Sequence, residues 1–202
     1  LVDVSDPRQP ELIVTLAMPG YASDIALSRG YAYVADQALG LTVIDVRDPE
    51  NPVTVASAAV PYYGRQVEIV GERAFVFVYG GGVVIYDVSV PSAPIELATL
   101  DQVRRPLTVN GTLGFSASEG LRVYDLSNPL EAAQIGFFSL SCNAWQVAVS
   151  GQTAFVANGY AGLTVLDISN PALPVELAQH QRVPGEGFVH GVSLAGAYAY
   201  LS

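Results

Sequence analysis

The sequence predicts an all-β protein, a β-propeller of four-stranded antiparallel blades, with about five blade equivalents in its 202 residues. One phrase recurs five times, an apolar strand that ends in aspartate and runs into a turn. The intervals between these aspartates are 42, 42, 38 and 42 residues. A period near that length, with four short strand candidates in each period, is typical of propeller blades. The five aspartates are Asp3, Asp45, Asp87, Asp125 and Asp167.

The first repeat shows the expected elements in order. After Asp3 come the strand candidates ELIVTLAM, DIALS, YAYVAD and LTVIDV, each bounded by Gly, Pro, Asp or Ser. The glycine before the aromatic strand, Gly30 in this repeat, predicts a tight hairpin with positive φ. Asp or Asn before proline starts a turn, because its side chain hydrogen-bonds the nearby backbone. We therefore interpret the five repeated aspartates as structural turn residues.

The repeats predict one continuous propeller, divided at about residues 3-44, 45-86, 87-124, 125-166 and 167-202. We expect Leu1–Val4 to be the last strand of a blade. Pairing of that strand onto Gly196–Ser202 would close a five-bladed ring and remove exposed sheet edges. The alternative is that the chain is a segment of a larger propeller. The sequence leaves both arrangements open.

Two phrases carry a family resemblance. GLTVIDVRDPENP, preceded by YAYVADQAL, and GLTVLDISNPALP, preceded by AFVANGYA, resemble the LVIVD repeat. The resemblance extends over the whole chain, although Val90 stands where other repeats have Asp or Asn. Such repeats occur mostly in bacterial and some archaeal surface or secreted proteins. The resemblance therefore implies a secreted or cell-surface propeller with a binding or scaffolding role, and it brings no shared catalytic motif.

The amino-acid composition limits the classes of partner that the chain is expected to bind. The net charge is −10 and all nine basic residues are arginine, which argues against nucleic acid and anionic membrane surfaces as partners. No run of apolar residues is long enough to predict a membrane span. Cys142 is the single cysteine, so no internal disulfide is possible, and we expect it to behave as a small apolar side chain.

The loop before each DIALS-type strand is the part of the repeat that varies. In a propeller such loops ring one mouth of the central channel, where aromatic and arginine side chains are typical of recognition sites. Large side chains that plug the channel are the alternative. Arg104 and Arg105, with Arg65 nearby, could bind a carboxylate or sulfate, or could be a solvated pair near Asp101. The candidate ligand- or partner-binding residues are Asp24, Arg65, Gln66, Arg104, Arg105, Trp145, Gln146 and His190.

Signals for catalysis and metal binding are weak. The chain has no nucleophile elbow, zinc-protease helix, phosphate-binding loop or calcium loop, and His180 and His190 lie ten residues apart. We therefore predict a non-enzymatic interaction or scaffold module without cofactor or metal, whose partner is a protein or another copy of itself. A small-ligand binder or enzyme at the channel mouth is the alternative, and a structural subunit of a fibre or envelope is a second one.

Overall fold

The computed structural model describes residues 1–80, 82–100, 107–117, 119–128, 131–181 and 187–202. In these residues every regular element is a β-strand, and none is a helix that could cross a membrane. The chain forms two compact units, Leu1–Asp101 and Gln102–Ser202. The all-β propeller class predicted from the repeats is confirmed by the sheets of both units.

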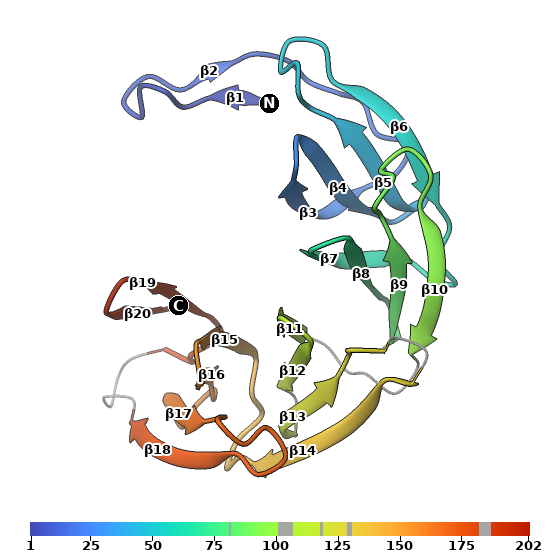
Figure 1. Cartoon of the computed structure of the whole chain (residues 1–202). Helices are drawn as coiled ribbons and strands as arrows, with labels where there is room; N and C mark the ends of the chain where they lie inside the picture. The colour runs from blue at the N-terminus through green and yellow to red at the C-terminus, as the bar shows by residue number, and fades with distance from the viewer. Residues whose placement is uncertain (81, 101–106, 118, 129–130, 182–186) are drawn as a thin grey trace. The chain divides into compact units, whose positions relative to one another are not determined.

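Unit 1 contains two four-stranded antiparallel sheets whose strands follow sequence order (Figure 1). Neighbouring strands along the chain are also neighbours in the sheet, because short hairpins connect them. The first sheet consists of β3 (Ala22–Ser28), β4 (Tyr31–Asp36), β5 (Gly40–Asp45) and β6 (Val53–Ala58). The second consists of β7 (Gly64–Val70), β8 (Arg73–Val78), β9 (Val83–Asp87) and β10 (Ile95–Leu100).

Unit 2 repeats the same plan with two four-stranded sheets and one hairpin. The first sheet consists of β11 (Leu107–Asn110), β12 (Leu113–Ala117), β13 (Gly120–Asp125) and β14 (Ala133–Ser139). The second consists of β15 (Gln146–Ser150), β16 (Thr153–Ala157), β17 (Leu163–Asp167) and β18 (Val175–His180). The hairpin is β19 (Val192–Ala195) with β20 (Tyr198–Leu201).

The strand that ends in the repeated aspartate is the third of its sheet, and the segment after the following turn is the fourth. This corrects the expected position of Leu1–Val4: its strand β1 (Val2–Asp3) pairs with the next segment, β2 (Glu11–Leu12), and so does not end its sheet. The physical reason is the short turn after Asp3, which folds the following segment directly back onto β1. Sequence repeats counted from the aspartates therefore begin near the middle of a sheet.

Two backbone irregularities recur at fixed places. The hairpin between first and second strands uses left-handed glycines in later repeats, but in the first sheet Arg29 takes that position with a φ of 50°. Each four-stranded sheet also has a register shift between its third and fourth strands. Such bulges raise the local twist of a sheet.

The second and third strands form the core because both of their faces are covered. In unit 1, Tyr33 and Val43 of the first sheet pack against Val76 and Tyr86 of the second. In unit 2, Phe115 and Leu166 belong to an equivalent core between its two large sheets. The fourth strands are mostly exposed or half-buried, so that chemistry on the surface must come from loops and edges.

The five repeated aspartates have the same hydrogen bond. The Oδ1 atom of each accepts the backbone N–H two residues further along the chain, at 2.7–3.1 Å. These bonds lower the pKa of the carboxyl groups, because a carboxylate accepts them better than a carboxylic acid does. The pKa of the Asp45 carboxyl is lowered furthest, to about 2, because this carboxylate is hydrogen-bonded to the Arg47 side chain.

We predict a loss of stability in acid that depends on Asp45. Since its pKa is lower in the folded state, the stabilisation is present above the ordinary value of 3.8 and is lost as pH falls through about 2. The Asp45→Asn variant should melt at a lower temperature than wild type at pH 6, and the difference should shrink as pH approaches 2. Thermal unfolding by circular dichroism across this range measures it. A difference independent of pH would contradict the assignment.

Candidate recognition face

In three of the four-stranded sheets, those that begin with β3, β7 and β15, two kinds of loop lie together at one end of the sheet. One is the loop before the first strand, and the other joins the second strand to the third. In unit 1, the Gln37 N–H donates to the Tyr21 carbonyl and the Tyr79 N–H to the Tyr63 carbonyl, at 3.0 and 2.9 Å. In unit 2, the Trp145 N–H donates to the Ala157 carbonyl at 2.9 Å. We call the two kinds of loop together the loop face of each unit.

The loop face carries most of the exposed aromatic side chains. Among the described residues nine aromatic side chains are exposed, and six of them lie in these loops. The others are on strands. Because aromatic side chains are usually at least half-buried, this concentration marks the loops as a candidate interaction surface. The six are Tyr21, Tyr62, Tyr63, Tyr79, Trp145 and Tyr160.

Two of the predicted site residues connect neighbouring sheets. In unit 1, Asp24 Oδ2 accepts the Val67 N–H at 3.0 Å, so β3 is joined to the first strand of the next sheet. In unit 2, Gln146 Oε1 accepts the Val192 N–H at 3.0 Å in the equivalent way. These side chains are therefore engaged in holding first strands side by side, a structural role that the sequence did not predict for them.

The other predicted site residues lie partly in unit 1 and partly in unit 2. Arg65 is exposed at the start of β7, and Gln66 Nε2 donates to Glu68 Oε1 at 3.3 Å. Arg104 and Arg105 lie outside the described residues. Trp145 and His190 are brought together in unit 2, with ring centroids 5.0 Å apart. The prediction that all eight residues form one binding site stays a prediction.

Sequence reasoning missed the aromatic partners supplied by the second-to-third-strand loops. Tyr79 lies edge-on to Tyr63, with centroids 6.4 Å apart, and Tyr160 lies edge-on to Phe188 at 4.5 Å. The available signal was the aromatic residue that follows the second strand in AFVFVY and AFVANGY. This aromatic residue indicates the site only in combination with the hydrogen bonds that place the two kinds of loop side by side.

Asp36 is a second residue that the sequence did not reveal. It is fully buried at the end of β4. Its Oδ1 accepts the N–H groups of Ala38 and Leu39 at 2.6 and 3.0 Å, and its Oδ2 accepts the Gly20 N–H at 3.3 Å. Asn158 occupies the same place in unit 2 and donates to Thr164 Oγ1 at 3.1 Å. Buried polar groups thus hold the loops that present the aromatic side chains.

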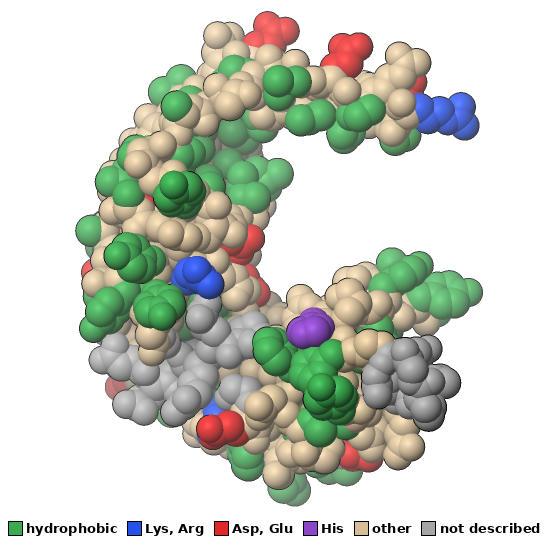
Figure 2. Space-filling view, turned by 180° about the vertical axis from the view of Figure 1, so that it is seen from behind, with side chains coloured by type: hydrophobic (Ala, Val, Ile, Leu, Met, Phe, Trp, Pro, Cys, Tyr) green, Lys and Arg blue, Asp and Glu red, His purple; other side chains and the backbone are tan. Residues whose placement is uncertain are grey.

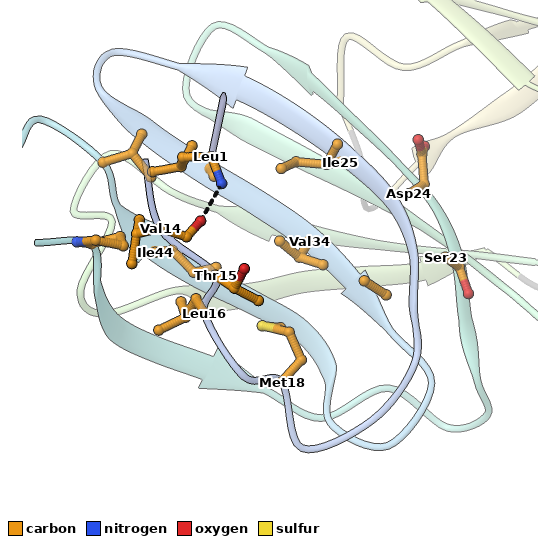
Figure 3. Close-up of a pocket in the computed structure, with 14 residues that line it drawn as sticks. Leu1, Val14, Thr15, Leu16, Met18, Ser23, Asp24, Ile25, Val34 and Ile44 are labelled. Carbon is orange, nitrogen blue, oxygen red and sulfur yellow. Dashed lines mark hydrogen bonds between the residues drawn. The ribbon is translucent and has the colours of Figure 1, made fainter. Parts of the chain in front are cut away.

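Unit 1 also contains a cavity of about 530 Å³ beside β3, β4 and β5 (Figure 3). Its lining is mainly apolar and includes Val34 and Ile44, while the Leu1 ammonium donates to the Val14 carbonyl at 2.7 Å. The corresponding side chains of the next sheet, Val76 and Tyr86, are covered by packing between sheets. The lining of the cavity therefore resembles the apolar faces through which neighbouring sheets pack.

No cluster of three or more metal-ligating side chains occurs in the described parts of the chain.

Replacing Gln146 tests the connection between first strands. Gln146→Ala removes the acceptor of the Val192 N–H and should lower the free energy of unfolding by about 1 kcal/mol. Gln146→Glu keeps an acceptor oxygen and should stay close to wild type. Urea unfolding of both variants measures the difference. Equal stability of wild type and Gln146→Ala would show that the bond contributes nothing.

Comparison with known proteins supports the fold. No curated protein matches the sequence. Among solved structures, the computationally designed Ika8 protein matches with a TM-score of 0.67 at 10% identity, over 88% of this chain and 54% of its own. A functionally unknown protein from Desulfotomaculum acetoxidans DSM 771 matches with a TM-score of 0.73 at 16% identity, over 93% of this chain and 64% of its own. The chain thus spans less than two thirds of either protein.

The LVIVD repeat matches residues 19–60, 63–102 and 141–180, which together make up more than half of the chain. Each match includes all four strands of one of the sheets described above. The chain therefore belongs to the LVIVD repeat family.

Proposed function

We propose that this chain is a non-enzymatic interaction module of a secreted or cell-surface protein, or of an extracellular assembly, and that it binds a protein partner through its loop face. The observation that carries the proposal is the concentration of exposed aromatic side chains in these loops. Tyrosine and tryptophan supply large, rigid contact areas with a polar group at the edge, as protein-recognition surfaces do. The extracellular setting rests on the family resemblance alone.

The polar side chains of these loops agree with a binding role. Asp24 and Gln146 make structural hydrogen bonds to the next first strand. The exposed side chains left for a partner include the aromatic ones, Arg65 in unit 1 and Asn143 in unit 2. Such a surface offers area and hydrogen-bond donors.

A comparison of captured proteins tests the proposal. Immobilised wild type is exposed to the extracellular protein fraction of the organism that makes it. A parallel column carries a variant with Tyr62, Tyr63 and Tyr79 changed to serine, and a control carries Ile95→Ser and Val175→Ser on exposed outer strands. We expect proteins retained by wild type and by the control to be lost from the tyrosine variant. Equal retention by all three would overturn the proposal, and so would substrate turnover by the wild-type protein.

A further inference from the structure

The first strand of unit 1 exposes an apolar face that other repeats bury. Ile25 of β3 stands at the position that later first strands fill with Val67, Val147 and Val192. Ile25 is 58% exposed, whereas the three valines are 2–3% exposed. Leu27, on the same face of β3, is 70% exposed. A face that the repeat normally covers is therefore open on β3.

The covering surface at each of these three valines is the second strand of the preceding sheet. The packed pairs are Val67 with Tyr33 of β4, Val147 with Phe115 of β12, and Val192 with Phe155 of β16. One repeat cannot bury its apolar face alone, and a neighbouring repeat buries it. The repeat therefore specifies what fits the open face of β3: the second strand of another sheet of the same kind.

The segment before β3 covers this face only in part. Leu16 and Met18 pack on Val34 and Ile44, and Figure 3 shows the cavity of about 530 Å³ that remains beside them. Ile25 lines that cavity. Space with apolar walls is thus left against β3.

The chain contains two half-sheets whose strand positions are complementary. Since β1 ends in the repeated Asp3, β1 and β2 have the positions of third and fourth strands, and Leu1 lines the cavity beside β3. In unit 2, β19 and β20 have the positions of first and second strands. Among the strands that the structure describes, β1 pairs only with β2 and β20 only with β19. A two-stranded sheet is marginally stable by itself, and the two halves together supply one complete sheet.

The β19–β20 hairpin presents the face that would cover β3. Tyr198 and Tyr200 stand at the positions of Tyr31 and Tyr33, which belong to the packing around Val67. Tyr198 is 71% and Tyr200 57% exposed, although Tyr33 is fully buried. Figure 2 shows exposed hydrophobic side chains over this hairpin. The same two residue types that cover Val67 are therefore open on β20.

We propose that the chain associates head to tail with a second copy of itself, the β19–β20 hairpin of one copy completing the β1–β2 sheet of the next. In the four-stranded sheets, the first residue of the second strand lies opposite the repeated aspartate. The same register sets Tyr198 opposite Asp3 and packs the tyrosines of β20 on Ile25 and Leu27. Because each copy has both halves, one kind of contact satisfies the hairpin of one copy and the open face of the next. This surface is separate from the loop face, so the inference goes beyond the binding function proposed above.

One side-chain hydrogen bond is expected across the contact. In unit 2, Thr108 Oγ1 donates to the Val147 carbonyl at 2.7 Å and so connects two neighbouring first strands. Ser193 of β19 stands at the position of Thr108, and Ile25 stands at the position of Val147. The Ser193 hydroxyl should therefore donate to the Ile25 carbonyl of the second copy.

Sedimentation velocity over a series of protein concentrations measures the association. We expect wild type to form larger assemblies as concentration rises, because a head-to-tail contact closes into a ring or continues as a filament. Leu27→Glu and Tyr200→Glu should each weaken association at least tenfold, since each buries a charge in an apolar contact. Ser193→Ala should weaken it about fivefold, through the loss of one hydrogen bond. Leu177→Glu, the same change at a leucine 58% exposed on β18, is the matched control and should stay within twofold of wild type.

Mixing two blocked variants tests the head-to-tail geometry. Leu27→Glu keeps an intact hairpin, and Tyr200→Glu keeps an intact β3 face. Each alone should stay monomeric at concentrations where their mixture forms dimers that grow no further, because one contact remains possible. Far-UV circular dichroism checks that both variants fold as wild type does.

A wild-type protein that stays monomeric at every concentration would overturn this inference and leave the open face of β3 to a different protein. Equal weakening by Leu27→Glu and Leu177→Glu would also overturn it, and so would a mixture of blocked variants that forms no dimers. If self-association fails in these ways while capture still depends on the tyrosines of the loop face, the interaction function stands. Loss of the tyrosine dependence in capture would instead count against the interaction function itself.

Discussion

Replacing Asp36 by alanine is expected to lower the free energy of unfolding by about 3 kcal/mol, because three backbone N–H groups lose one buried acceptor at once. Asp36 is fully buried and accepts three backbone N–H groups, whereas the repeat aspartates are exposed or half-buried, which places Asp36 above them in importance. The measurement is equilibrium urea unfolding of purified wild type and variant.

Asp36→Asn is the matched control. Its amide oxygen can still accept the Ala38 and Leu39 N–H groups, so the loss should be about 1 kcal/mol. If Asp36→Ala destabilised the protein no more than Asp36→Asn, the carboxylate would not be holding the loop as described.

Gly136→Val is expected to prevent unit 2 from folding at ordinary temperatures. A Cβ atom at Gly136 would overlap the carbonyl oxygen of Pro171, and backbone at that place cannot rotate away. Overpacking of this kind costs several kcal/mol, and Gly136→Ala should already cost about 3 kcal/mol. Heteronuclear NMR and thermal unfolding of both variants measure the loss.

Gly187→Ala is the control within the same unit. Among the residues that the structure describes, nothing lies within 4 Å of a Cβ atom at Gly187, so the free energy of unfolding should change by about 0.5 kcal/mol or less. Similar melting of Gly136→Ala and Gly187→Ala would contradict the close packing between β14 and the turn at Pro171.

The strands were predictable because each is repeated. YAYVAD and its relatives combine alternation with a preceding turn glycine, and they became β4, β8, β12, β16 and β20. The position of a sheet boundary was not predictable in the same way. A tandem repeat has no intrinsic start, so the order of strands within a sheet depends on which neighbours pair, and only the hairpin after Asp3 settles that for β1 and β2.

The candidate site was predictable only in part. Alignment of first strands located Trp145 and His190, which do meet in unit 2. It could not show that Tyr160 joins them through Phe188, because the contact links a hairpin loop to a loop from a different sheet. Asp24 and Gln146 were chosen because they stand in a loop that varies between repeats, yet their side chains accept hydrogen bonds from the next first strand.

We propose that the residues shared by the repeats stabilise the fold, while the unshared aromatic residues bind the protein partner. The most direct test measures both properties on two variants, Asp87→Ala and the triple serine variant of Tyr62, Tyr63 and Tyr79. We expect Asp87→Ala to lower the melting temperature and keep the captured proteins, since its carboxylate bonds the Ser89 N–H at 2.8 Å. The triple serine variant should keep its melting temperature and lose the captured proteins. The reverse pattern, with binding lost in Asp87→Ala and kept in the tyrosine variant, would contradict the account.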